Sequence, residues 1–123
     1  MKRILVVDDD PAIRRMTKLG LESAGAYTVF MENLGVRAVE TARSCRPDLI
    51  LLDIMMPDMD GSDVATALQE DPELRHIKLV FLTALLSKSQ ETKSGEHIVI
   101  AKPVTTQELV AIIEQELGPA GPG

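Results

Sequence analysis

Five short apolar runs are spaced along the chain, and none alternates apolar with polar residues as a half-exposed strand does. They occupy residues 4–7, 27–31, 49–52, 79–82 and 98–101. Continuous apolar runs of this length are typical of strands buried on both faces of a parallel sheet. The pattern therefore predicts five strands that are covered by helices.

The first two segments between these runs carry helix signals. Asp10 can cap a helix that has Pro11 at its first position, and Gly25 can end it. Asn33 can cap a second helix, and Pro47 lies beyond its end. The residues expected to face inward are Ile13, Met16, Gly20 and Ala24 in the first helix and Val36, Val39 and Ala42 in the second.

Three more helices are expected. One begins at Gly61, a weak one covers about residues 86–93, and the last has a capping box formed by Thr105 and Glu108. The apolar residues expected inward are Val64, Ala65 and Leu68 in the third helix and Leu109, Ile112, Ile113 and Leu117 in the last. Alternation of strands and helices predicts an α/β fold of (βα)5 type with right-handed crossovers.

Length and composition narrow the class of protein. With 123 residues the chain is expected to form one domain over residues 1–117, followed by a Gly/Pro-rich tail or linker at 118–123. The longest apolar run has five residues, which argues against a membrane span or an export signal. The net charge of −6 argues against direct nucleic-acid binding. A single cysteine, Cys45, fits a cytoplasmic location.

Polar residues directly follow four of the five apolar runs. In an open α/β sheet, ligands bind outside the carboxyl ends of the strands, so these residues are expected along one edge of the sheet. Taken singly, each could be a helix cap, a turn residue or a solvated charge; together they indicate a site. The polar residues are Asp8, Asp9, Asp53, Thr83 and Lys102, and Ala84 and Pro103 follow the last two of them.

The residue types at these strand ends fit phosphoryl chemistry. Three carboxylates brought together repel one another unless a cation joins them, and hard oxygen ligands suit Mg²⁺. Lys102 would attract a phosphoryl group, and Thr83 could donate a hydrogen bond to it. Asp53 would be the acceptor, because carboxylates form aspartyl phosphates.

The sequence resembles the receiver domain of bacterial two-component response regulators, of the kind found in chemotaxis, over about residues 2–117. The matching motifs are Ile4-Leu5-Val6-Val7-Asp8-Asp9, Asp53-Ile54-Met55-Met56-Pro57 with Asp60-Gly61 after it, Thr83-Ala84 and Lys102-Pro103. The resemblance implies a flavodoxin-like, doubly wound sheet of five parallel strands in the order 2-1-3-4-5. It also implies a signalling domain rather than an enzyme.

The resemblance implies a role for each matching residue. Asp53 would accept the phosphoryl group, and Mg²⁺ would bind Asp53, Asp9 directly, Asp8 through water, and the backbone carbonyl of Met55. Thr83, with Ala84 beside it, would sense the phosphoryl group. Lys102 would pair with it, aimed by a cis bond to Pro103. The donor would be a phosphohistidine on a sensor histidine kinase or a phosphotransfer protein, and the signal would pass to an unidentified downstream protein.

Three features depart from the family pattern. Val99 stands where most receivers have an aromatic residue that takes part in switching. The stretch between Thr83 and the glycine before the last strand is short, which implies a short fourth helix. Met55 and Leu85, at two positions that influence hydrolysis of the phosphoryl group, are both apolar.

Two other functions stay open on the sequence alone. Asp58-Met59-Asp60-Gly61-Ser62 matches the signature of haloacid-dehalogenase-type phosphatases, in which Asp58 would be the nucleophile and Asp60 its partner. That motif should directly follow a buried strand, whereas here the strand ends at Asp53. The other possibility is a receiver-like interaction module that is never phosphorylated.

Overall fold

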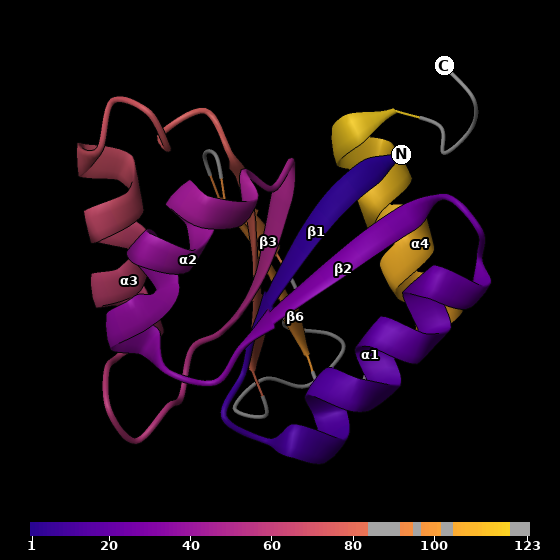
Figure 1. Ribbon diagram of the computed structural model, residues 1–123, viewed down its shortest axis with the longest axis horizontal. Coiled ribbons are helices and arrows are strands. Elements are labelled where there is room, and N and C mark those ends of the chain that lie inside the picture. Colours follow the sequence, from indigo (N-terminus) through magenta and orange to yellow (C-terminus); the bar gives the residue numbers. More distant parts are fainter. Residues whose placement is uncertain (84–91, 95–96, 102–104, 119–123) are drawn as a thin grey trace.

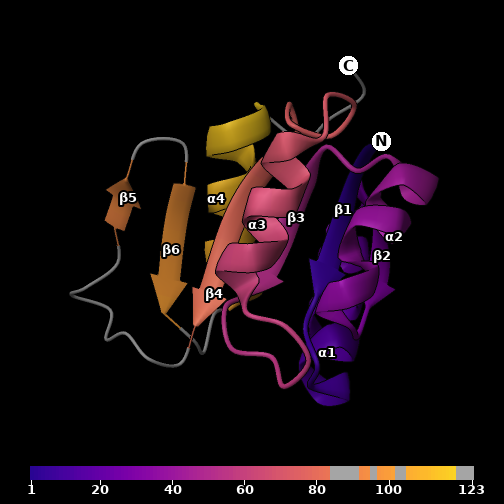
Figure 2. The ribbon, with the colours of Figure 1, turned by 90° about the vertical axis from the view of Figure 1, so that its left-hand side faces the viewer.

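A computed structural model describes the protein over residues 1–83, 92–94, 97–101 and 105–118. Its centre is a six-stranded sheet in the order β2-β1-β3-β4-β6-β5. Five strands are parallel and confirm the expected order, while β5 pairs antiparallel with β6 at one edge (Figure 2). The strands are β1 (Lys2–Val7), β2 (Tyr27–Glu32), β3 (Leu49–Asp53), β4 (Lys78–Thr83), β5 (Thr92–Ser94) and β6 (His97–Ala101).

Helices cover both faces of this sheet. Helices α1 (Pro11–Ser23) and α4 (Thr106–Leu117) lie on one face (Figure 1). The 3₁₀ turn η1 (Gly35–Arg37), α2 (Ala38–Cys45) and α3 (Gly61–Glu70) belong to the other. Each face has its own apolar cluster, and the strands contribute alternate residues to the two. No helix in the described ranges is long and apolar enough to cross a membrane.

Several local signals act as expected. The carboxylate of Asp10 accepts a hydrogen bond from the Ala12 N–H at 2.9 Å and so caps α1. Gly25 follows that helix with φ +85°, a conformation that glycine adopts without a Cβ penalty. Thr105 and Glu108 form the reciprocal capping box at the start of α4. These boundaries depend on residues a few positions apart, which is why the sequence predicts them.

The inward face expected for the first helix is wrong in part. Met16 is 71% exposed and Ala24 is exposed, whereas Leu21 is the residue of α1 that is completely buried. Gly20 lies so close to Thr106 of α4 that a Cβ would collide with the threonine hydroxyl. Leu21 packs into the apolar cluster on this face of the sheet, whereas Ala24 is the C-cap residue beyond the last turn of α1.

The start of the second helix also differs from the expectation. The turn η1 precedes α2, so Val36 lies in the turn and is 64% exposed, while Ala38 and Ala42 are completely buried. The N-cap residue of η1 is Leu34, whose side chain makes no capping hydrogen bond, and the expected cap Asn33 does not occupy this position. The N–H groups here are bound instead by carboxylates from elsewhere, as described below.

The fourth helix expected at about residues 86–93 is wrong at its end, because Thr92 and Lys93 lie in β5. They pair with Val99 and Ile98 of β6. Residues 84–91 lie outside the described ranges. Threonine is β-branched and favours strands, so pairing with β6 competes successfully with a weak helix signal at this position.

Strand β2 forms the other edge of the sheet, and its burial is incomplete. Met31 near its end is 44% exposed, so the expectation of burial on both faces is wrong there. At Val29 the outward backbone groups are bound by α1: Lys18 Nζ donates to the carbonyl at 3.2 Å, and Glu22 Oε2 accepts from the N–H at 3.2 Å. Lys18 Nζ and Glu22 Oε2 also form an ion pair, with 3.7 Å between the two atoms.

An ion pair joins α2 to the residue that ends α3. Arg43 Nε donates to Asp71 Oδ2 at 3.0 Å, and the Glu73 N–H donates to Asp71 Oδ1 at 2.9 Å. The N–H of Glu73, helped by the guanidinium of Arg43, lowers the pKa of Asp71 from its ordinary value. A carboxyl group whose pKa is lower in the folded protein than in the unfolded chain stabilises the fold at pH values above the unfolded pKa. This stabilisation is lost as pH falls through the folded value.

We therefore expect Asp71→Asn to lower the midpoint of thermal unfolding at neutral pH. The difference in unfolding midpoint between variant and parent should narrow as pH falls below about 4, the ordinary range of the aspartate pKa. Thermal unfolding followed by circular dichroism from neutral to acid pH measures this, with Asp63→Asn as an exposed aspartate control. A difference that stays constant over the whole pH range would contradict this role of Asp71.

Candidate functional site

Three aspartates meet at the carboxyl end of the sheet, the lower end in Figure 1. Asp8 and Asp9 follow β1, and Asp53 ends β3. One carboxylate oxygen from each lies within 4.8 Å of those of the other two. Asp8 and Asp53 are only 1% and 5% exposed, whereas Asp9 is exposed. The strand order brings them together because β1 and β3 are parallel neighbours.

The backbone around Asp8 is held by several hydrogen bonds. Its N–H donates to the carbonyl of Glu32 at 3.1 Å, and its Oδ1 accepts from the Asp10 N–H at 3.0 Å. Arg14 Nη1 donates to the Asp8 carbonyl at 2.6 Å. The first turn of α1 thus fixes the loop that carries Asp8 and Asp9. The contribution of Arg14 was not expected, since nothing in the sequence marks a basic residue in α1 as a partner of that carbonyl.

The loop that follows Asp53, residues 54–60, closes on itself. Asp53 Oδ1 accepts from the Met55 N–H at 3.1 Å, and the Gly61 N–H donates to the Ile54 carbonyl at 2.9 Å. A Cβ on Gly61 would lie 2.7 Å from the Cα of Ile54 and 2.8 Å from the carbonyl oxygen of Asp53. Only a residue without a side chain lets α3 start this close to the phosphoacceptor candidate.

The outer side of this loop forms a groove of about 480 Å³. Met55 in it is 57% exposed, whereas Met56 is largely buried. The groove therefore presents an apolar surface beside the acidic residues. Its lining residues are Ile54, Met55, Met56, Pro57 and Asp60.

Thr83 ends β4 and is 1% exposed. It lies next to the position that pairs with Asp53, because Asp53 is in register with Leu82. Val99 on β6 is half-buried, packs with the cluster beneath α2 and α3, and is in register with Phe81. Ala84, Leu85, Lys102 and Pro103 lie outside the described residues, so their expected places stay predictions.

The comparison with known proteins settles the class. The family model of the response regulator receiver domain matches residues 4–114. The chain belongs to this family. Phosphorylation on an aspartate is characteristic of receiver domains, which act in two-component signalling.

Two curated relatives show the range of proteins in which similar domains occur. The chain is 34% identical to the polar-differentiation response regulator DivK of Brucella anthropi, with 97% of this chain and 98% of DivK covered. It is 39% identical to the DNA-binding dual master transcriptional regulator RpaA of Synechocystis sp., covering 90% of this chain but 47% of RpaA. Among solved structures, the chemotaxis protein CheY4 of Vibrio cholerae superposes with a TM-score of 0.82 at 27% identity, with 95% and 99% covered. Receiver domains thus occur alone and within longer regulators.

The acidic residues of this receiver domain fit the cation that the family typically binds. Their donors are all carboxylate oxygens, the ligand type that Mg²⁺ prefers. Three negative charges within 4.8 Å, two of them on buried residues, repel one another strongly unless a cation lies between them.

The phosphatase reading of Asp58 and Asp60 is not supported in this receiver domain. Asp60 caps α3 by accepting from the Ser62 N–H at 3.0 Å, and Asp58 binds N–H groups at the start of η1. Neither belongs to the acidic group formed by Asp8, Asp9 and Asp53. The two aspartates therefore have structural partners, and the family match excludes the dehalogenase class.

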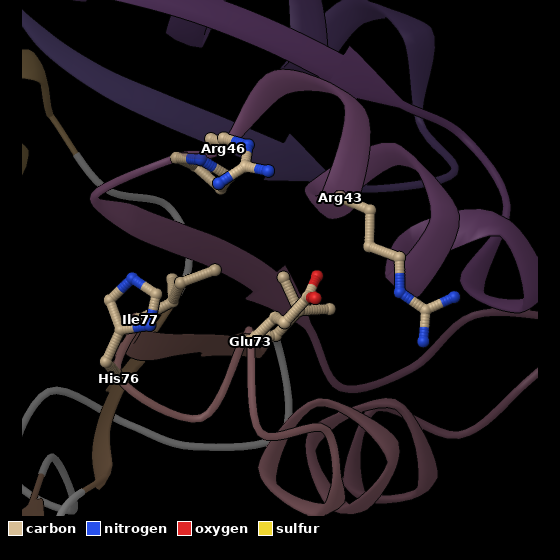
Figure 3. A pocket seen from close by; sticks show the side chains of 7 residues that line it. Arg43, Arg46, Glu73, His76 and Ile77 are labelled. Carbon is tan, nitrogen blue, oxygen red and sulfur yellow. The ribbon is translucent and has the colours of Figure 1, made fainter.

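A second, smaller hollow lies at the opposite end of the sheet (Figure 3). It measures about 120 Å³, and its residues come from the segments before β3 and β4 rather than after them. Arg46 on its rim ends α2 in the left-handed conformation, with φ 47°. Its position separates it from the acidic group of Asp8, Asp9 and Asp53. The lining residues are Arg43, Arg46, Pro47, Glu73, Leu74, His76 and Ile77.

Proposed function

We propose that this receiver domain, residues 1–117 with a tail or linker at 118–123, accepts one phosphoryl group on Asp53. The donor is a phosphohistidine on a sensor histidine kinase or phosphotransfer protein in the cytoplasm. The observation that supports Asp53 is its burial at the end of β3, with its carboxylate within 4.8 Å of those of Asp8 and Asp9. A conformational change then carries the signal to a downstream protein.

The transfer is a nucleophilic displacement at phosphorus. An oxygen of the Asp53 carboxylate forms the new bond, the bond from phosphorus to the imidazole nitrogen breaks, and that electron pair returns to the imidazole. The product is an acyl phosphate. The hydrogen bond from the Met55 N–H to Asp53 Oδ1 orients the carboxylate for this attack.

The neighbouring residues have supporting roles in this proposal. Asp8, Asp9, Asp53 and the backbone carbonyl of Met55 would hold Mg²⁺. When bound, the ion neutralises negative charge on the transferring phosphoryl group. Thr83 would donate a hydrogen bond to the phosphorylated state, and Lys102 would pair with a phosphoryl oxygen. The burial of Thr83 at the end of β4, next to the position that pairs with Asp53, supports this role.

The proposal is tested by incubating the protein with acetyl phosphate and following its mass. In the presence of Mg²⁺ we expect one phosphoryl group per chain, labile to base as an acyl phosphate is. Adding a chelator should prevent the gain. An unchanged mass with Mg²⁺ present would support the alternative function, an interaction module that is never phosphorylated.

A further inference from the structure

The loop beside the phosphorylation site makes a second connection, through Asp58. Its Oδ1 accepts from the Gly35 N–H at 3.2 Å, and its Oδ2 accepts from the Val36 N–H at 3.1 Å. Both donors belong to η1, which leads into α2, more than twenty residues away in the chain. One exposed carboxylate thus ties the middle of loop 54–60 to the start of another element.

The start of η1 depends on carboxylates from outside it. Glu32 Oε2 accepts from the N–H groups of Asn33 and Leu34, both at 3.0 Å, and Asp58 takes the next two. These are orphan donors at a helix start, which need acceptors from elsewhere. The backbone of Glu32 is bound in turn to Asp8. Asp58 therefore binds this run of N–H groups directly, whereas the loop of Asp8 is connected to it only through the backbone of Glu32.

Close packing makes this connection stiff. A Cβ on Gly35 would lie 2.9 Å from the Cβ of Met59 and 3.3 Å from the Cε of Met56. The backbone of η1 thus rests directly on loop 54–60. The lowered pKa of Asp58 agrees with this geometry, since the N–H groups of Val36 and Gly35 favour its charged form although the residue is exposed.

We propose that Asp58 is a positioning residue for the phosphorylation site. By holding the middle of the loop against η1, it keeps the backbone of Met55 beside Asp53. Met55 is where the loop touches the site, through its N–H on Asp53 Oδ1 and through the carbonyl proposed as a Mg²⁺ ligand. The inference rests on the proposed function, because it concerns the Mg²⁺ that the function requires. By linkage, an ion that orders the loop also strengthens the contact to η1.

Magnesium titrations of matched variants test this role. Asp58→Ala should bind Mg²⁺ roughly threefold to tenfold more weakly than Asp63→Ala, because groups that orient metal ligands affect affinity on this scale or above. Asp63 is an exposed residue in the first turn of α3, so its variant removes the same charge without touching η1. Asp58→Asn keeps one acceptor oxygen and should give an intermediate dissociation constant. It also supplies the comparison if the alanine variant does not fold.

Amide NMR signals give a readout that a purely stabilising contact would not move. Adding Mg²⁺ should shift the Gly35 and Val36 signals in the parent and in Asp63→Ala, but much less in Asp58→Ala. The positioning role is refuted if the Asp58 variants bind Mg²⁺ as tightly as Asp63→Ala and if the Gly35 and Val36 signals of the parent do not shift when Mg²⁺ is added. A parent that binds no Mg²⁺ and gains no phosphoryl group would instead refute the proposed function, and the inference with it.

Discussion

Asp53→Asn should abolish phosphorylation by acetyl phosphate, the largest functional effect we expect from a single substitution. The amide has nearly the shape of the carboxylate but is a far weaker nucleophile, and it cannot form an acyl phosphate. Because Asp53 Oδ1 accepts from the Met55 N–H, the amide oxygen can keep that hydrogen bond and the loop should persist. Mass spectrometry after incubation at saturating Mg²⁺ measures the result.

The same experiment on Asp58→Asn separates the two aspartates. At saturating Mg²⁺ this variant should still reach one phosphoryl group per chain, more slowly than the parent, because Asp58 positions the loop and does not react. Label that persists in Asp53→Asn and maps to residue 58 would overturn the assignment of the acceptor. Thermal unfolding of both variants excludes the loss of folding as the cause.

Gly61→Ala should destabilise the protein by about 1–3 kcal/mol, the usual cost of forcing extra atoms into a packed site. Alanine is the better helix former by about 1 kcal/mol, so propensity alone predicts the opposite sign. The clash decides, because the new Cβ would meet the backbone of Ile54 and Asp53 at 2.7–2.8 Å, and backbone cannot rotate away. The displaced Asp53 should also accept a phosphoryl group more slowly.

Gly20→Ala is the matched control for this substitution. Its Cβ would also collide, but with the side chain of Thr106, which can rotate about its χ1 bond. We expect its free energy of unfolding to stay within about 1 kcal/mol of the parent, since helix propensity offsets the adjustment. Chemical denaturation of both variants gives the comparison. Equal losses of stability would show that contact with backbone is not what makes Gly61 necessary.

The strands and the acidic site could be predicted from the sequence because both depend on short-range patterns. A continuous apolar run followed by an aspartate, as at residues 49–53, shows a buried strand and a polar end in five residues. Parallel strand topology then brings Asp8, Asp9 and Asp53 to one edge. The capping box of Thr105 and Glu108 is equally local.

What the sequence did not predict depends on contacts between distant segments. Met16 is apolar and spaced like a core residue, yet it is 71% exposed, and the close contact of α1 with α4 is made by Gly20 against Thr106. Asn33 is a good capping residue by type, but the carboxylate of Asp58 reaches the η1 donors from another loop. Neither partner can be identified before the fold places the segments together.

The edge at β2 has a consequence for how the protein behaves when it is concentrated. A strand from a second molecule could extend the sheet only by bonding to backbone groups that point outward from this edge. At Val29 both groups are taken by Lys18 and Glu22, and an incoming strand would have to strip two charged side chains from them. The Lys18–Glu22 ion pair on α1 thus protects these edge groups, as a covering helix would. It hinders edge-to-edge aggregation of neighbouring copies on this side of the sheet.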